Sequence, residues 1–385
     1  MIEAPTPDGT ENEQYPIEPR YHPVNRITRS IYNFLASAKL AMALLVVIFA
    51  CCLAGVTIYR GDRAWALIFN SLWFNSLLVL LVINIACCFF GRIWGRKITI
   101  ISFGMILFHL SFVCILGGIV FNSLYYFRGN IRLTEGEVLP SNDPQSYDAI
   151  EQGKFFTISK LKGETALIKM HTAYKVAGAD KRAAYEVAVG QGSAKTQGMI
   201  YITHKLTHKG VDYFNNSEGY SLQLSLSDDK NKYLYGAIIP FQSIRQQDRS
   251  YIYSTGFSDN KVAFADQIPF PQPPESPKFG LQVTYTPSKL KERGGRTAFQ
   301  LFPLNFRGLP IAGLPFASGS AEIGESFRAG SYTLKVDEVR YWVSMVVRYE
   351  PGKPIVLTSL WVALTGMIIT TLGRMFKKGA VRLDV

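Results

Sequence analysis

Four long uncharged runs constrain this chain of 385 residues more than any other feature. Each has at least the roughly 20 residues that an α-helix needs to cross a hydrocarbon core about 30 Å thick. Helices of this length in a soluble core carry a polar face, and these runs carry none. We therefore predict four transmembrane helices. They are expected at 39–60, 65–91, 98–124 and 354–374.

Basic residues are concentrated on one side of the predicted helices. Segments rich in Lys and Arg stay in the cytoplasm, so we expect cytoplasmic tails at 1–38 and 375–385. Residues 125–353 then form an extracytoplasmic domain between helices three and four. The polar first 30 residues have no apolar core before a cleavage site, so we expect a partly disordered tail and no signal peptide. The basic residues concerned are Arg20, Arg26, Arg29, Lys39, Arg92, Arg96, Lys97, Arg374, Lys377, Lys378 and Arg382.

The residues between the third and fourth predicted helices favour β-structure. Segments such as YSLQLSLSD and KFGLQVTYT alternate apolar and polar residues, and Gly, Pro, Asn and Asp separate them. We also interpret FFTISKL as a strand and SYDAIEQGK as a turn or loop. The predicted fold class is an integral membrane α-helical protein with four transmembrane helices. A large β-rich extracytoplasmic domain is inserted between helices three and four.

The predicted domain lacks the motifs of an enzyme. All five cysteines lie in the predicted helices, so the domain has no disulfide, no CxxC pair and no CxxCH haem-attachment motif. It also has no G-x-S-x-G, no H-E-x-x-H and no phosphate loop, and its spread charge gives no nucleic-acid signature. His204 and His208 are four residues apart, which on a strand places them on one face and permits a metal or haem site. Without a third ligand, we expect a solvated strand face instead.

His109 is the only histidine in the predicted helices. It lies 12 residues after Lys97, which places it about 18 Å along a helix and near the middle of the bilayer. An ionisable residue at that depth is costly and is a candidate functional site. Its helical neighbours form an apolar face with one sulfur and one aromatic ring. These neighbours are Met105, Ile106, Phe112, Val113 and Leu116.

Three roles are open for His109. It could hydrogen-bond a neighbouring helix, ligate haem iron or transfer a proton, and the local residues alone favour the structural role. One histidine supplies one axial ligand. A six-coordinate haem would therefore need its second ligand from another chain.

The order of the elements and four sequence stretches resemble the ResB/CcsB proteins of the System II cytochrome c maturation pathway. The resemblance covers the topology of the whole chain and the local sequence of residues 34–137 and 345–376, and it leaves the middle of the domain unmatched. The stretches are FLASAKLAMALLVVI, FNSLWFNSLLVLLVINIACC, FHLSFVCILGGIV with FRGNIRLTEGE, and RYEPGKPIVLTSLWVALTGMI.

The resemblance implies a function in haem export and cytochrome c synthesis. A CcsA/ResC-type multi-span partner with a tryptophan-rich segment would carry haem across the membrane with this chain and attach it to apocytochrome c. This chain has only scattered tryptophans, so it would be a subunit of a haem-lyase complex without a catalytic site of its own. The expected location is the bacterial cytoplasmic (inner) membrane with a periplasmic domain. Membrane lipid and thiol-reducing pathway proteins are the further expected partners.

In this family the histidine of the third span is an axial ligand to a membrane haem. His109 matches that position, and the resemblance therefore implies that it ligates the iron of a non-covalent haem b shared with the partner. The haem would lie against Met105, Phe112, Val113 and Leu116. Two other functions stay open. One is a scaffold or electron-transfer subunit of a respiratory cytochrome complex, and the other is a non-haem membrane-anchored binding or assembly protein.

Overall fold

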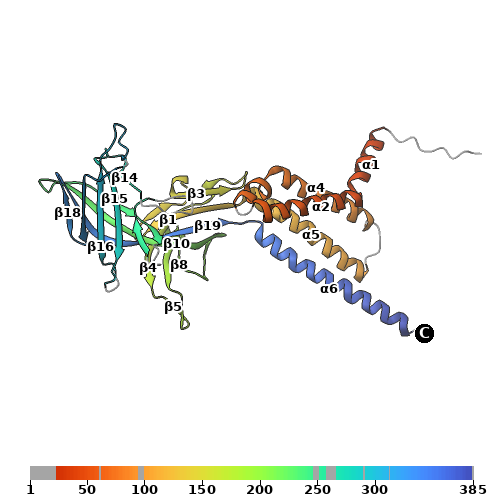
Figure 1. Ribbon diagram of the computed structural model, residues 1–385. Helices are drawn as coiled ribbons and strands as arrows, with labels where there is room; N and C mark the ends of the chain where they lie inside the picture. Colours follow the sequence, from red (N-terminus) through yellow and green to blue (C-terminus); the bar gives the residue numbers. More distant parts are fainter. Residues whose placement is uncertain are drawn as a thin grey trace, which may run out of the picture. The chain divides into compact units, whose positions relative to one another are not determined.

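The computed structural model describes residues 23–59, 62–93, 99–245, 251–256, 266–288, 291–311 and 313–383. The chain divides into two compact units (Figure 1). One unit combines Met1–Ser123 with Gly352–Val385 and is helical, and the other is Leu124–Pro351 and is β-rich. The first 22 residues, which hold most of the predicted N-terminal tail, lie outside the described residues.

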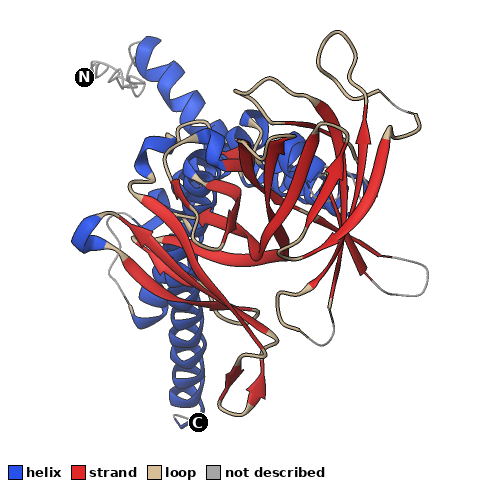
Figure 2. Cartoon of the chain, turned by 90° about the vertical axis from the view of Figure 1, so that its left-hand side faces the viewer, coloured by secondary structure: helices blue, strands red, loops and turns tan. Residues whose placement is uncertain are grey.

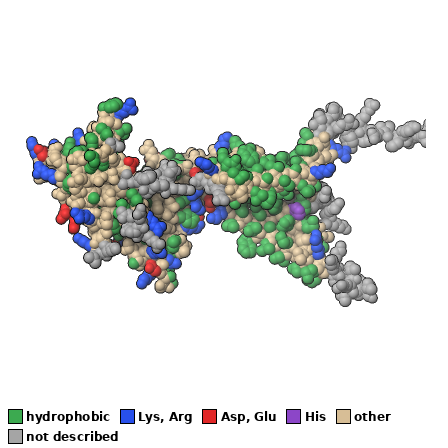
Figure 3. Space-filling model, viewed as in Figure 1, with side chains coloured by type: hydrophobic (Ala, Val, Ile, Leu, Met, Phe, Trp, Pro, Cys, Tyr) green, Lys and Arg blue, Asp and Glu red, His purple; other side chains and the backbone are tan. Residues whose placement is uncertain are grey.

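Among the described residues, four helices are long and apolar enough to cross a membrane: Ala38–Tyr59, Leu72–Phe89, Ile100–Tyr125 and Lys353–Phe376. Hydrophobic side chains occupy much of the face of the helical unit that Figure 3 shows, as expected for helices that face lipid. Together with the large β-rich unit, these helices confirm the predicted combination of a membrane-spanning part and a β-rich part. The helical elements are α1 (Pro23–Leu35), α2 (Ala38–Ala54), a π-helix (Gly55–Tyr59), α3 (Asp62–Ala64), a second π-helix (Trp65–Phe69), α4 (Leu72–Ile93), α5 (Ile100–Tyr125) and α6 (Lys353–Leu383).

Two details of the helical unit differ from the prediction. The predicted tail contains the helix α1, which starts with Pro23 in the first turn, where a missing N–H costs nothing. The second predicted span starts at residue 65, whereas α4 starts at Leu72. Ser71 caps this start, because its Oγ accepts a hydrogen bond from the Phe74 N–H at 3.3 Å. Asn70 and Ser71 are uncharged, so an argument based on the absence of charge does not detect the interruption.

Two buried asparagines tie the helices together. The Asn84 side chain is fully buried and donates hydrogen bonds to the carbonyls of Leu35, at 2.6 Å, and Ser37, at 3.0 Å. It therefore satisfies carbonyls at the α1–α2 connection. Asn75 donates to the Ser123 hydroxyl at 2.9 Å and so joins α4 to α5. Such bonds replace those that water would otherwise supply, because the hydrocarbon offers none.

The helices α5 and α6 pack through glycines. A Cβ on Gly366 would lie 2.7 Å from the carbonyl oxygen of Gly104 and 2.8 Å from the backbone nitrogen of Phe108. At the other end, a Cβ on Gly352 would lie 2.1 Å from the Gly118 carbonyl oxygen. The two backbones therefore approach as closely as small residues allow, which is how helices associate in lipid.

Replacing Gly366 by valine should separate α5 from α6. The added side chain meets backbone that cannot move aside, so we expect the helical unit to lose about 1–3 kcal/mol of stability. The matched control is Gly117→Val, because nothing lies within 4 Å of a Cβ at Gly117. Thermal melting of the detergent-solubilised protein measures the difference. Equal melting temperatures for the two variants would contradict the close contact.

The described residues of the β-rich unit form three sheets and a small hairpin (Figure 2). The first sheet has the order β11-β10-β19-β1-β3, and β18 and β9 extend it beside β19 and β10. Its strands are β1 (Phe127–Thr134), β3 (Tyr147–Gln152), β9 (Leu206–His208), β10 (Val211–Asp228), β11 (Tyr233–Pro240), β18 (Ser326–Ala329) and β19 (Tyr332–Tyr349).

The second sheet has the order β12-β13-β15-β16-β17, with β14 beside β15, and the third has the order β2-β4-β7-β8. The strands of the second are β12 (Gln242–Arg245), β13 (Tyr251–Ser254), β14 (Ile268–Phe270), β15 (Phe279–Pro287), β16 (Gly295–Phe302) and β17 (Ala317–Glu322). Those of the third are β2 (Val138–Pro140), β4 (Glu164–Thr172), β7 (Ala183–Gly190) and β8 (Thr196–Tyr201), and the hairpin is β5 (Lys175–Val176) with β6 (Ala179–Asp180).

The strands β10 and β19 have 18 residues each and pair antiparallel along nearly their whole length. Their register shifts between Gln223 and Leu224, where Asp337 is an extra residue in β19. The Ser225 hydroxyl donates a hydrogen bond to the Asp337 carboxylate at this bulge. Across this bulge the buried positions of β19 change from even-numbered, Leu334 and Val336, to odd-numbered, Val339 and Tyr341, as one inserted residue requires.

The long strand pair contributes to two hydrophobic cores. One core lies between the first sheet and the four-stranded sheet, with Val343 and Met345 from β19 against Leu167 and Val187. The other lies between the far half of the pair and the six-stranded sheet, with Leu334 among its members.

Two local predictions for this unit are wrong. SYDAIEQGK, expected to be a turn or loop, contains the edge strand β3, which pairs with β1. FFTISKL, expected to be a strand, forms no strand, and its residues 158–160 make a 3-10 turn. Its Phe156 and Leu161 belong to a hydrophobic core, so the apolar enrichment reflects burial rather than strand pairing.

Candidate functional site

His109 lies in α5, about 14 Å from Ile100 and about 24 Å from Tyr125 at about 1.5 Å per residue. Its Nδ1 lies 2.8 Å from the carbonyl oxygen of Met105, one turn earlier in the same helix. The hydrogen bond of the ring is therefore made within α5 and not to a neighbouring helix.

The neighbouring helix contacts the ring by stacking. Phe89 of α4 is parallel to His109 within 10°, with the ring centroids 3.9 Å apart. Phe108 meets the imidazole edge-on, at 5.4 Å between centroids. These contacts hold the plane of the imidazole in one orientation.

The hydrogen bond to Met105 determines which nitrogen of His109 is available. A carbonyl oxygen only accepts, so Nδ1 carries a hydrogen, and in the neutral imidazole Nε2 then carries the lone pair. Nε2 forms no hydrogen bond with any residue that the structure describes. A neutral imidazole with Nδ1–H bonded to a carbonyl and Nε2 free is the usual form of a histidine metal ligand. The residues therefore fit one axial ligand for iron.

The other residues of the predicted site are only partly brought together. Met105 contacts the His109 ring through its carbonyl. Phe112 is 37% exposed, and Val113 is half-buried. Leu116 instead packs in the apolar cluster of α2 and α4, with Leu44 and Leu78 among its members. No group of three or more His, Cys, Asp or Glu side chains that could hold a metal occurs among the described residues.

His204 and His208 do not share a strand face. A turn after Tyr201 separates them, and the His204 ring stacks on the Tyr201 ring with 5.0 Å between centroids. His208 is in β9, is only 7% exposed and lies 2.8 Å from the Thr196 hydroxyl through Nδ1. The expectation of a solvated face is therefore wrong for His208. Burial, and then the Lys209 charge, lower the pKa of His208 below its usual range.

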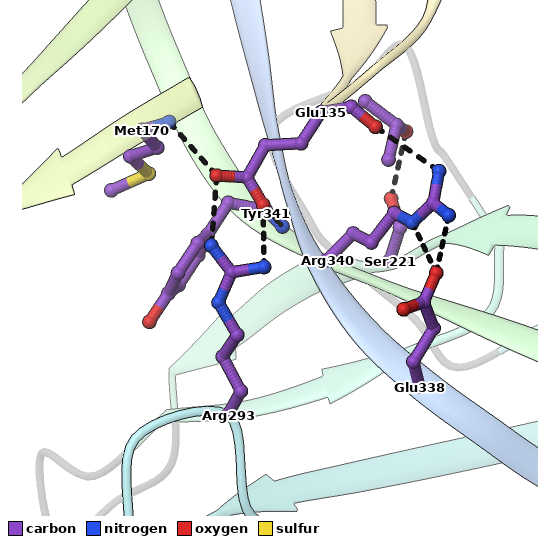
Figure 4. A network of polar contacts seen from close by, with 8 residues as sticks. Glu135, Met170, Ser221, Arg293, Glu338, Arg340 and Tyr341 are labelled. Carbon is purple, nitrogen blue, oxygen red and sulfur yellow. Dashed lines mark hydrogen bonds and ion pairs between the residues drawn. The ribbon is translucent and has the colours of Figure 1, made fainter. Parts of the chain in front are cut away.

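A buried carboxylate forms the most connected polar contact of the β-rich unit (Figure 4). Glu135 follows β1, and its side chain is 7% exposed. It accepts hydrogen bonds from the backbone N–H groups of Met170, at 2.8 Å, and Tyr341, at 3.3 Å. The Arg293 guanidinium forms a two-pronged contact with its two oxygens, each at 3.0 Å.

The Glu135 contact joins strands of two sheets to a connecting segment of the third. Met170 is in β4, Tyr341 is in β19, and Arg293 is in the connection from β15 to β16. Arg340 adds a bond to the Glu135 carbonyl at 3.2 Å and pairs with Glu338. An open hollow of about 640 Å³ lies beside this network, lined by side chains of both charges. A carboxylate with this many donors is a structural cross-link, and nothing in its geometry resembles a nucleophile or a general base.

The family model for ResB-like proteins matches residues 95–375, which is most of the chain. The chain belongs to the ResB-like family. It is thus a membrane protein of the cytochrome c biogenesis type. No curated protein sequence matches the chain.

The family match agrees with the resemblance in the sequence and extends it. It begins just before α5 and takes in the β-rich unit and most of α6. The middle of the domain, which the sequence stretches left unmatched, is therefore part of the ResB-like region.

Sequence reasoning missed three features of this ResB-like chain. Phe89 lies 20 residues before His109, and no spacing rule relates side chains on two helices. Glu135 and Arg293 are 158 residues apart, and a lone acid after a strand carries no signal for burial. The burial of His208 had a signal, because the Lys209–Gly210 dipeptide is a plausible two-residue hairpin turn that places His208 inside a strand pair.

Removing the Glu135 carboxylate should destabilise the β-rich unit of the ResB-like protein. In Glu135→Ala the two backbone donors and Arg293 lose their acceptor. We therefore expect the free energy of unfolding to fall by about 3 kcal/mol. The control is Glu338→Ala, whose carboxylate also pairs with an arginine but is 46% exposed, and should cost less than about 1 kcal/mol. Urea unfolding followed by circular dichroism measures both. Equal losses would show that Glu135 is not the cross-link described.

Proposed function

We propose that this ResB-like protein is a subunit of a haem exporter and cytochrome c synthetase. With a CcsA/ResC-type partner it would carry haem across the membrane and support its attachment to apocytochrome c. The observation that carries the proposal is the His109 imidazole, which presents a free Nε2 from a helix long enough to span the membrane. Membership of the ResB-like family supports it.

In this proposal the residues around His109 position one ligand. His109 would supply Nε2 to the iron of a non-covalent haem b, and the Met105 carbonyl would hold the tautomer through Nδ1. Phe89 would prevent rotation of the ring by stacking on it. Phe112 and Val113, which are incompletely buried, would offer apolar contact to the porphyrin. Haem, when bound, is the group that is carried and later attached to the apoprotein.

The proposal assigns the second axial ligand to the partner. His109 is the only histidine in the four helices that could span a membrane. The partner, rather than this chain, would also hold the attachment site.

The proposal also includes a direction across the membrane. The excess of Lys and Arg at residues 92–97 and 374–382 supports a cytoplasmic location for both segments. The β-rich unit would then lie on the periplasmic side of a bacterial inner membrane. Apocytochrome c would meet it there.

Replacing His109 by alanine should remove haem from the membrane site. The protein is purified from its own membrane with its co-purifying chains, and the Soret absorbance is measured per mole of protein. Removal of an outer-shell partner of a metal ligand typically lowers metal affinity by roughly 10–100-fold. Since His109 would be the ligand itself, we expect a larger loss of haem, seen as a fall in the Soret absorbance. Formation of c-type cytochromes, measured by haem staining of the membrane fraction, should fall with it.

The matched control is His204→Ala, which removes an imidazole that stacks on Tyr201 in the β-rich unit. It should keep both the Soret absorbance and the c-type cytochromes. A His109→Ala protein with unchanged absorbance would refute the ligand assignment. Loss of one respiratory activity with c-type cytochromes intact would favour the scaffold or electron-transfer alternative.

A further inference from the structure

A cavity of about 180 Å³ lies in the β-rich unit, and it shares no lining residue with the hollow beside the Glu135 network. Three lysines line it: Lys160, Lys162 and Lys209. Lys160 ends the 3-10 turn after β3 and Lys162 follows two residues later, whereas Lys209 is in the turn between β9 and β10. Phe156 and Tyr349 give the cavity an apolar wall.

The positive charge of this cavity is not compensated. None of the three lysines forms an ion pair with a residue that the structure describes, and no Asp or Glu is among the described residues that line the cavity. Elsewhere in the same unit, Lys195, Lys205 and Lys335 each pair with a carboxylate. Lysines gathered around a hollow without a counter-charge attract an anion.

His208 supplies a directional donor at the same place. It lines the cavity, and its Nε2 is buried without a hydrogen-bond partner among the described residues. The Thr196 hydroxyl can donate to Nδ1, which leaves the hydrogen on Nε2. A buried N–H without an acceptor is unfavourable, and an anionic oxygen in the cavity would satisfy it.

The backbone around Lys209 is held in an unfavourable conformation. Lys209 has φ +48° and Gly210 has φ +81°, the two positive angles of a tight hairpin turn between His208 and Val211. Asn, Asp or Gly normally occupies the first position of such a turn, because these residues tolerate a positive φ. A lysine side chain does not stabilise this backbone conformation. Strain of this kind is typical of functional positions. Here it places a cation next to the buried His208 nitrogen.

The cavity adjoins the end of a membrane-spanning helix. The Lys160 ammonium lies 5.1 Å from the centre of the Tyr125 ring, and Tyr125 is the last residue of α5. Tyrosines at the ends of spanning helices lie at the level of the lipid headgroups. The headgroup layer adds about 5–7 Å on each side of the hydrocarbon core, so a phosphate there is within reach of a lysine side chain.

We propose that this lysine cavity, defined by Lys160, Lys162, Lys209 and His208, binds a phosphate group, and that the headgroup of an anionic phospholipid supplies it. The lysines neutralise the phosphate, and His208 donates a hydrogen bond from Nε2. Phe156 and Tyr349 contact the glycerol and the first carbons of the acyl chains. The proposal is independent of haem binding, since none of these residues belongs to the His109 site.

The test compares two double variants of the full-length protein in nanodiscs of phosphatidylcholine with a minority of phosphatidylglycerol. Native mass spectrometry counts the phosphatidylglycerol molecules that stay bound to the protein after the protein is released from the nanodisc. Lys160→Gln with Lys209→Gln should reduce this retention on the order of tenfold, because two lysine–phosphate contacts are removed. Lys175→Gln with Lys230→Gln removes the same charge from exposed positions outside the cavity, one in the hairpin strand β5 and one in a turn, and should behave as the unchanged protein.

A second arm distinguishes the two sources of phosphate. Inorganic phosphate is titrated into the protein in lipid-free detergent and followed by phosphorus NMR. Binding that disappears in the Lys160/Lys209 variant, with unchanged phosphatidylglycerol retention, would assign the cavity to free phosphate and overturn the lipid source. Equal lipid retention and equal phosphate binding in both double variants would overturn the site itself.

Discussion

The antiparallel pairing of β10 with β19 is the interaction on which the β-rich unit depends. Both strands run through two cores, so neither core can form unless this ladder has the correct register. Bulges near Ser217 and Leu224 each insert one residue, which keeps the apolar side chains of each strand directed toward both cores. The buried Glu135 carboxylate then connects β19 with β4 and the β15–β16 connection.

A different constraint governs the helical unit, because lipid offers no partner to a polar group. The side-chain nitrogens of two buried asparagines there donate to specific backbone groups or side chains. Asn84 serves the carbonyls of the α1–α2 connection, and Asn75 bonds Ser123. His109 differs, because its hydrogen bond is made within its own helix through Nδ1, while Nε2 has no partner among the described residues. That asymmetry is the physical basis for treating His109 as a ligand rather than a helix tie.

The sequence predicts the parts of this structure that depend on local composition. The four apolar helices and the β-rich region follow from hydropathy and alternation, and His109 follows from one titratable ring in an apolar run. The start of α4 at Leu72 depends on a single hydroxyl, and the bulge at Asp337 depends on pairing between distant strands. The stacking of Phe89 on His109 and the Arg293–Glu135 contact join residues far apart in the chain. Periodicity carries no information on such contacts.

The hydrogen bond between His109 and Met105 has a consequence for the order of assembly. It spans one turn of a single helix, so it forms when α5 forms and needs no other part of the chain. The choice of ring nitrogen is therefore made during synthesis and insertion, before α6 has been made. Any group that later binds the imidazole finds Nε2 already available, so no partner has to supply the energy of a tautomer change.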